Sequence, residues 1–176
     1  PASSSELSSA VPMGHPFEIE QEAAVDATPE QVWEAISTGP GLSSWFLGRY
    51  EIEPREGGTA TLEIGGFTDV ATVTTWNPPN RLVTRGEPGS DGSFHHFDYT
   101  IDRQEGGRTE VRWVHSGMLG DDWEAEYEGM SEGDPMYFRK LLEYVTYFPG
   151  RYATPVDAFG PNVPGDKDAA MAVFRR

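Results

Sequence analysis

The sequence predicts an α+β domain in which a curved antiparallel sheet of about six to seven strands wraps around one long C-terminal helix. Three features predict it: strict apolar alternation near the start, a β-branched, glycine-punctuated middle, and an amphipathic aromatic segment near the end. The 176 residues suit a single domain, and 37% hydrophobic residues suffice for a core. A cavity can remain where such a sheet curls around its helix.

The first strand and the first helix are predicted from adjoining patterns. Apolar and acidic residues alternate over residues 17–25, which indicates a half-buried strand. Thr28 and Gln31 then have the spacing of a capping box, and Pro29 stands at the first helical position. A helix is therefore expected to begin at this point.

A second short helix and the rest of the sheet follow. Gly39-Pro40-Gly41 is expected to break the first helix, and residues 42–48 are expected to form the second. Runs of β-branched and aromatic residues bounded by Gly, Pro and Asn indicate the strands. These runs are a hairpin over 50–66 that turns at Gly57-Gly58, and strands over 70–76, 81–87, 94–102 and 109–117.

The C-terminal third changes to helical periodicity. Asp134 as cap and Pro135 in the first turn predict a long helix over 134–148 with an aromatic inner face. The acidic stretch 121–134 before it is read as a solvated helix or a lid, or else as an acidic face for a basic partner. The predicted boundaries are a disordered leader over 1–16, a folded domain over 17–148, and a proline-rich extension over 149–176 that ends in a short helix.

Composition excludes several classes of function. With 13 basic against 29 acidic residues the net charge is −16, which disfavours binding to nucleic acid or to an anionic membrane surface. No cysteine is present, so disulfides and thiolate metal sites are excluded. No apolar run suits a membrane span or a signal peptide, so a cytoplasmic location is expected. Only Lys140 and Lys167 are lysines, a bias typical of GC-rich bacterial genes or of an acidic, salt-adapted surface.

The order of these elements and five short motifs resemble the START-like, helix-grip superfamily, also called SRPBCC. Within it the chain is most similar to the family named for the activator of the heat-shock protein 90 ATPase. The motifs are VWEAIST, GLSSWF, EGG, NPPNRL and GGRTEVRWVHSGM, in that order. The resemblance covers about Phe17 to Phe148 and implies a helix-grip fold. It implies much less about function, because this fold carries many unrelated ligands and chemistries.

A hairpin of the strands 94–102 and 109–117 supplies the candidate binding face. Pairing Ile101 with Val111 places three pairs on one face: Tyr99 with Trp113, Phe97 with His115, and His95 with Gly117. His96 then faces solvent. The two inward histidines are either the polar end of an apolar pocket or ordinary residues bonded to backbone groups at a strand end.

We therefore expect a protein that holds a small apolar or aromatic molecule in a cavity on the order of a few hundred Å³ between the sheet and the last helix. Trp45-Phe46, on the second short helix, is expected to border the cavity mouth. The candidate ligand-binding residues are Trp45, Phe46, Phe67, His95, Phe97, Tyr99, Trp113, His115, Tyr137, Leu141 and Tyr144.

Two alternatives remain open. One is a protein-interaction or chaperone ATPase-activating module, which only the resemblance implies. The other is an enzyme of cyclase or hydrolase type that uses His115 as a general acid. The sequence carries no nucleophile elbow, phosphate loop or HExxH motif, so no catalytic residue, metal or cofactor is expected. Aromatic residues of the 149–176 extension could cover a sheet edge, bridge two copies in a homodimer or contact another protein.

Overall fold

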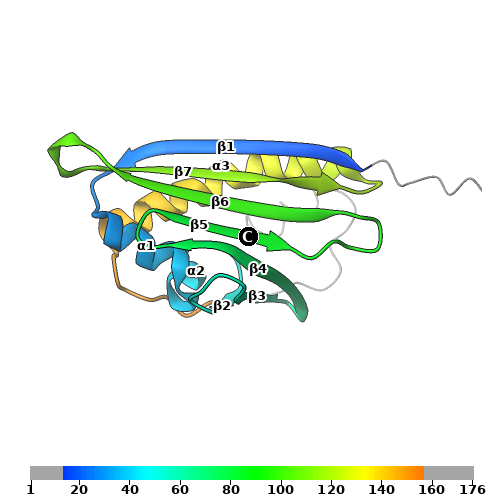
Figure 1. Cartoon of the computed structure of the whole chain (residues 1–176), viewed down its shortest axis with the longest axis horizontal. Helices are drawn as coiled ribbons and strands as arrows, with labels where there is room; N and C mark the ends of the chain where they lie inside the picture. The colour runs from blue at the N-terminus through cyan, green and yellow to red at the C-terminus, as the bar shows by residue number, and fades with distance from the viewer. Residues whose placement is uncertain (1–13, 157–176) are drawn as a thin grey trace, which may run out of the picture.

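The computed structural model describes residues 14–156, which form one seven-stranded antiparallel sheet and three α-helices (Figure 1). Residues 1–13 of the predicted leader, and residues 157–176 of the predicted extension with its expected short helix, lie outside the described residues. The leader was predicted to end at residue 16, but β1 already begins at His15. The strands are β1 (His15–Val25), β2 (Arg49–Ile52), β3 (Thr59–Ile64), β4 (Phe67–Asn77), β5 (Arg81–Gly86), β6 (Phe94–Arg103) and β7 (Thr109–Leu119). The helices are α1 (Pro29–Ser37), α2 (Gly39–Trp45) and α3 (Trp123–Tyr147), and a short 3₁₀ turn, Glu105–Gly107, joins β6 to β7.

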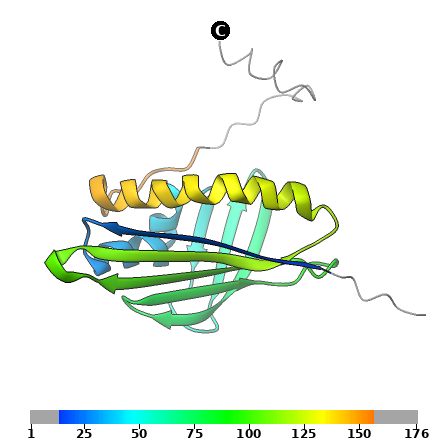
Figure 2. The same ribbon diagram turned by 90° about the horizontal axis from the view of Figure 1, so that it is seen from above.

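The sheet has the order β1-β7-β6-β5-β4-β3-β2 and is strongly curved. In Figure 2 the strands β2–β4 run steeply across the direction of β1, β6 and β7. Helix α3 packs on β1 and β7 at one side of the concave face, and α2 packs on β2 at the other. The predicted α+β helix-grip fold is confirmed, with seven strands.

Helix α1 begins as its sequence predicts. The Thr28 side chain accepts a hydrogen bond from the Gln31 amide at 3.2 Å, and the Gln31 side chain accepts one from the Thr28 amide at 2.8 Å. This reciprocal pair is the predicted capping box, which satisfies two amides that the helix leaves free. Val32 and Ile36 on the inner face are fully buried.

Helix α2 begins three residues earlier than predicted. Gly39-Pro40-Gly41 ends α1 but also forms the first turn of α2, because Thr38 caps the new helix. The Thr38 hydroxyl accepts a hydrogen bond from the Gly41 amide at 3.0 Å. Proline is well tolerated in a first helical turn, so this motif separates two helices without a loop between them.

Helix α3 also begins earlier, at Trp123 rather than at Asp134. The acidic stretch and the predicted helix form one continuous helix of 25 residues with Pro135 inside it. Asp134 is therefore not a helix cap. Its side chain is buried and bonded to the sheet instead, as described below.

The predicted register of the β6–β7 hairpin is confirmed. Ile101 lies opposite Val111 at one end and His95 lies opposite Gly117 at the other. His96 is on the opposite face, as expected, but it is partly buried rather than fully exposed. Most of the buried core lies on the concave side and joins α1, α2 and α3 to the strands.

Candidate functional site

A small apolar cavity lies on the concave face, between α1, α2 and the strands β2–β6. Its volume is about 50 Å³, far below the few hundred Å³ expected from the sequence. This space suits one or a few water molecules rather than an organic ligand. The lining residues are Ile36, Leu42, Phe46, Tyr50, Ile52, Ala60, Leu62, Asp69, Ala71, Leu82, Thr84, Phe97 and Tyr99. Asp69 is the single charged group among them and is exposed, so it marks the side that faces solvent.

Phe46 is the reason that the cavity is small. Phe46 follows the last residue of α2, and its ring packs near five other aromatic rings. One of these is at the end of α2, and the others are on β2, β6, β7 and α3. The centroid distances are 4.7 Å to Tyr137, 5.3 Å to Trp45, 5.8 Å to Tyr50, 6.1 Å to Trp113 and 6.3 Å to Phe97. Phe46 itself is only partly buried. The protein therefore fills the centre of its aromatic interior with one side chain that reaches the surface.

Trp113 forms the floor of this aromatic group and carries an unpaired donor. Its side chain is 1% exposed, and its ring stacks on Tyr99 at 5.8 Å. Its indole N–H has no hydrogen-bond partner among the described residues. Trp45, which is equally buried, donates its own N–H to the Ala35 carbonyl at 2.9 Å. A buried donor without an acceptor is rare, so the Trp113 N–H is a feature that a ligand or a water would satisfy.

The two inward histidines form a hydrogen-bonded chain with carboxylates at both ends. Asp134 Oδ2 lies 2.8 Å from His115 Nδ1, and His115 Nε2 lies 3.0 Å from His95 Nδ1. His95 Nε2 lies 3.3 Å from Glu126 Oε1. The chain thus runs from a buried end at Asp134, on α3, to a partly exposed end at His95 and Glu126.

Aromatic rings hold this chain in place. Phe97 stacks on His115 with 4.2 Å between ring centroids, and Phe17 meets the same ring edge-on at 5.0 Å. Burial lowers the pKa of His95, and the positive charge of His115 lowers it further, while Glu126 and Asp69 act in the opposite direction. The neutral form of His95 is therefore favoured more than in a free histidine.

Two tyrosines beside the cavity are held in the neutral form. Burial is the main cause that raises the pKa of Tyr50 and the pKa of Tyr99, and nearby Asp69 and Asp134 respectively add to it. Their hydroxyl groups therefore act as hydrogen-bonding groups and not as phenolates near neutral pH.

The structure brings only part of the predicted binding set to the cavity. Phe46, Phe97 and Tyr99 line it, and Tyr137 packs against Phe46. The remaining predicted residues fall into two further groups. Trp45, Trp113, Leu141 and Tyr144 are buried core residues, and His95 and His115 belong to the polar chain.

Phe67 is placed away from the cavity. It is 63% exposed and begins β4 opposite Ile64, across the Gly65-Gly66 turn at the tip of the β3–β4 hairpin. Phe67 is not among the residues that line the cavity, so it is not one of the walls that the sequence suggested. The alternation of Ala60 with Leu62 was the signal that could have identified the actual wall.

Two further features were sought in residues 14–156, a metal site and a membrane-spanning helix. No group of three His, Asp or Glu side chains in this range could hold a metal ion. The range also contains no helix whose length and apolar character would allow it to cross a membrane.

Comparison with known proteins identifies the family. The family model described as "Activator of Hsp90 ATPase homolog 1-like protein" matches residues 26–146. The chain belongs to this family. No curated protein matches the chain.

Solved structures agree on the fold. A protein from Mesorhizobium loti has 20% identity and a TM-score of 0.62 over 72% of this chain and 95% of its own. The Aha1 dimer from Colwellia psychrerythraea has 20% identity and a TM-score of 0.60 over 76% and 99%. A protein from Bacillus halodurans has 25% identity and a TM-score of 0.62 over 73% and 96%.

Proposed function

We propose that this protein binds a small apolar or aromatic molecule on the concave face, in the space that the Phe46 ring now fills. The observation that carries the proposal is the position of Phe46, which is surrounded by aromatic rings and borders an apolar cavity. Trp113 supports it as well. Its buried N–H has no hydrogen-bond partner among the described residues, and its ring centroid lies 6.1 Å from that of Phe46.

Volume decides how a ligand could enter. The existing space of about 50 Å³ is too small even for benzene, which occupies engineered cavities of about 150 Å³. The Phe46 ring is itself the size of benzene, so its movement outward would add a volume of that order to the cavity. The ligand would then take over the aromatic contacts that Phe46 makes in the closed state.

The local backbone suits such a movement. Phe46 lies in the short link between α2 and β2 and is only partly buried, so rotation of its own side chain would carry the ring towards solvent. Gly48 in the same link has φ +69°, and a Cβ there would lie 2.5 Å from the Glu63 carbonyl. The geometry of the link therefore requires glycine at position 48. Phe46, two residues earlier, lies between the core and solvent.

The experiment is a thermal-shift screen of the whole chain against apolar molecules, from fatty acids to polycyclic aromatics. A ligand at 100 times its dissociation constant adds about 2.7 kcal/mol to the free energy of unfolding, which raises Tm by roughly 5–10 °C. Trp113→Ala is expected to abolish the shift. A flat screen with the folded wild-type protein would overturn the proposal.

Two variants of Phe46 separate a native site from an artificial cavity. Phe46→Ala removes the competing ring and is expected to tighten binding of the ligands that wild type already binds. Phe46→Trp enlarges the plug and is expected to weaken the same ligands. Phe148→Ala, at a residue 50% exposed outside the cavity, is the matched control and is expected to change neither.

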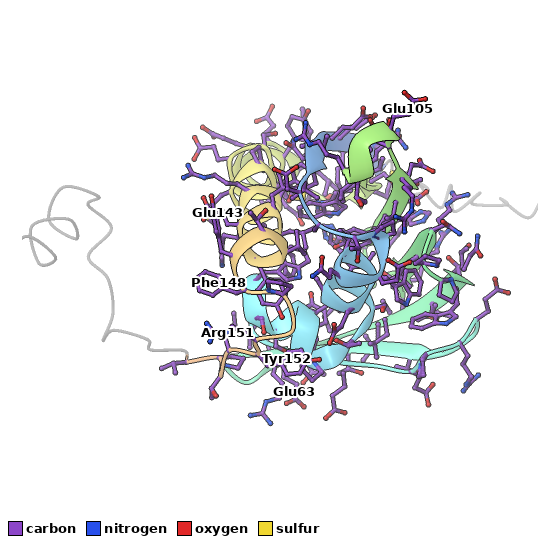
Figure 3. All side chains as sticks on the ribbon, turned by 90° about the vertical axis from the view of Figure 1, so that its left-hand side faces the viewer. Glu63, Glu105, Glu143, Phe148, Arg151 and Tyr152 are labelled. Atoms are coloured by element: carbon purple, nitrogen blue, oxygen red, sulfur yellow. The ribbon has the colours of Figure 1, made fainter. Side chains whose placement is uncertain are left out.

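A second candidate function is a protein-interaction module that activates a chaperone ATPase. The family description suggests it, and exposed apolar side chains at the end of α3 and in the segment after it favour it: Tyr147, Phe148, Tyr152 and Val156 are 70%, 50%, 53% and 86% exposed. Figure 3 shows the chain passing through Phe148 and Arg151 to Tyr152. An unchanged Hsp90 ATPase rate on mixing would remove this candidate, and sedimentation at several concentrations would test a homodimer like the Colwellia one.

A further inference from the structure

The two halves of α3 are held to the sheet very differently. The helix has five buried side chains, and all of them lie at or after position 134: Asp134, Phe138, Leu141, Tyr144 and Val145. None of the residues 123–133 is buried. Figure 2 shows the helix lying along β1, with its first turns beside the start of that strand. The first half therefore covers this end of the sheet without being part of the close-packed core.

A hollow of about 270 Å³ lies between this first half and the sheet. Trp123 and Tyr127 line it from the helix, and Phe17 and Leu119 line it from β1 and β7. Phe17 and Leu119 are themselves 8% and 1% exposed. The wall that the strands contribute is therefore apolar and covered, and the helix above it does not fill the space.

Two side-chain contacts join the first half to the strands. The Trp123 ring stacks on the His15 ring with 4.6 Å between centroids, and Glu126 Oε1 lies 3.3 Å from His95 Nε2. His15 is exposed, and the side chains of His95 and Glu126 are 35% and 42% exposed. Contacts between groups that water also reaches add little stability, so they hold the first half weakly.

The junction of the two halves has a sequence that weakens a helix. Pro135 has no N–H to bond to the Ser131 carbonyl, four residues earlier, and its ring crowds that carbonyl. Gly133 is also a poor helix residue. In the described part of the chain, a Cβ at Gly133 would meet no heavy atom of another element within 4 Å, so packing does not require glycine. The local sequence therefore favours an interruption where the structure has a continuous helix.

The first half also contains features that oppose its own helix. Glu124, Glu128 and Glu132 are spaced four residues apart, so their like charges are neighbours on one helix face and repel each other. Residues 123–133 contain no lysine or arginine that would offset this repulsion. Ser131 Oγ donates to the Tyr127 carbonyl at 2.7 Å, a contact that often bends helices.

We propose that residues 123–133 form a hinged lid, which opens away from β1 about Gly133-Asp134-Pro135. Asp134 is the fixed point of the hinge, because its buried carboxylate lies 2.8 Å from His115 Nδ1 and the side chains after it are packed in the core. Opening exposes the apolar wall of the hollow at Phe17 and Leu119. The lid thus controls access to a second apolar site, separate from the one under Phe46.

An introduced thiol reports the opening, because the chain contains no cysteine. Leu119→Cys places a thiol under the lid, and Val145→Cys places one under the second half of α3; both positions are 1% exposed. We expect dithiobis(nitrobenzoate) to react with Leu119→Cys more than about tenfold faster than with Val145→Cys, since opening the lid costs less than global unfolding. Urea unfolding of each variant gives the rate expected from global unfolding alone. A Leu119→Cys rate no higher than that value overturns the lid.

Variants of the two glycines test the hinge in the Leu119→Cys chain. Gly133→Ala is expected to slow the thiol reaction about fivefold, and Pro135→Ala to slow it by more, because both stiffen the junction. Gly129→Ala is the matched control: a Cβ there also meets nothing within 4 Å, and residue 129 moves with the lid, so no change is expected.

If Gly129→Ala slows the reaction as much as Gly133→Ala, the first half unfolds instead of turning about the hinge, and the proposal is wrong. An unchanged rate in both Gly133→Ala and Pro135→Ala contradicts it as well. No ligand enters these measurements. A flat thermal-shift screen therefore leaves the lid standing, and failure of the lid leaves the site under Phe46 standing.

Discussion

The two sides of the concave face differ in how they are closed. On the β1–β7 side, α3 lies on the strands, and the inward residues Val111, Trp113 and His115 are at most 5% exposed. On the β2–β5 side the wall is made of small or partly exposed residues, such as Ala60, Ala71 and Leu62, and the cover is a single half-buried ring, Phe46. One side of the sheet is therefore fully covered by α3. The other side has a small cavity that a single partly buried side chain, Phe46, covers.

This difference shows where function and stability are separated. The side under α3 provides close packing that stabilises the fold, since the side chains of Val111, Trp113 and Leu141 are fully buried there. The side under Phe46 keeps a small void, and the Trp113 ring, whose buried N–H has no partner among the described residues, lies next to the Phe46 ring. A binding site needs such incomplete packing, because ligand contacts must replace contacts that the protein gives up.

The largest expected effect comes from Leu141, on the sealed side. Leu141→Ala deletes a fully buried side chain of α3 and is expected to lower the free energy of unfolding by about 2–5 kcal/mol. Leu62→Ala, at the partly exposed cavity wall, is expected to cost less than about 2 kcal/mol, because part of its surface already contacts space or solvent. Urea unfolding measures both, and equal losses would contradict the contrast between the two sides.

A smaller effect is expected at the buried end of the histidine chain. Asp134→Ala leaves the His115 N–H buried without an acceptor, which is expected to cost about 1–3 kcal/mol. Asp134→Asn retains a carbonyl acceptor and is expected to cost less. At the exposed end, Glu126→Ala is expected to stay within about 0.5 kcal/mol. If Glu126→Ala lowered the free energy of unfolding as much as Asp134→Ala, burial of the side chain would not determine how much each carboxylate stabilises the protein.

The sequence predicted the fold well because its signals are local. Alternation, capping and glycine turns act within a few residues, and the Thr28–Gln31 capping box and the register of His95 with Gly117 are both confirmed. The predicted start of α3, at Asp134, was wrong because Asp134-Pro135 has the local pattern of a helix start. What overrides that pattern is a tertiary contact, the hydrogen bond from His115 to Asp134, and no local rule can show it.

The site was less predictable for the same reason. Aromatic residues on the inner face could be recognised from the strand period, but the volume they leave depends on how Phe46 packs against rings from β2, β6, β7 and α3. Such packing is a property of the assembled interior. Phe67 was misplaced for a related reason, because the sequence shows an aromatic residue at the start of a strand but does not show that its side chain is exposed and away from the cavity.

The smallest expected effect is on the pH dependence of stability, and it probes the boundary between the two sides. Burial first, and then the charge of His115, hold the pKa of His95 below its usual value of 6.5, against the attraction of Glu126 and Asp69. Burial lowers the pKa of His96 as well. The unfolded chain then binds more protons than the folded one between the folded pKa values and 6.5. Stability is therefore complete above about pH 6.5 and falls as the pH drops towards 5.

Urea unfolding at pH 7.5, 6.5 and 5.5 measures this slope, and His95→Gln is expected to make it shallower. Carboxylates such as Glu20, whose pKa the Arg112 hydrogen bond lowers, lose their contribution only below about pH 4.5, outside this window. A wild-type stability that increases from pH 7.5 to 5.5 would mean that Asp134, Glu126 and Asp69 keep a proton on the histidine pair. His95 Nε2 would then be a donor in the folded protein, with the Glu126 carboxylate as its acceptor.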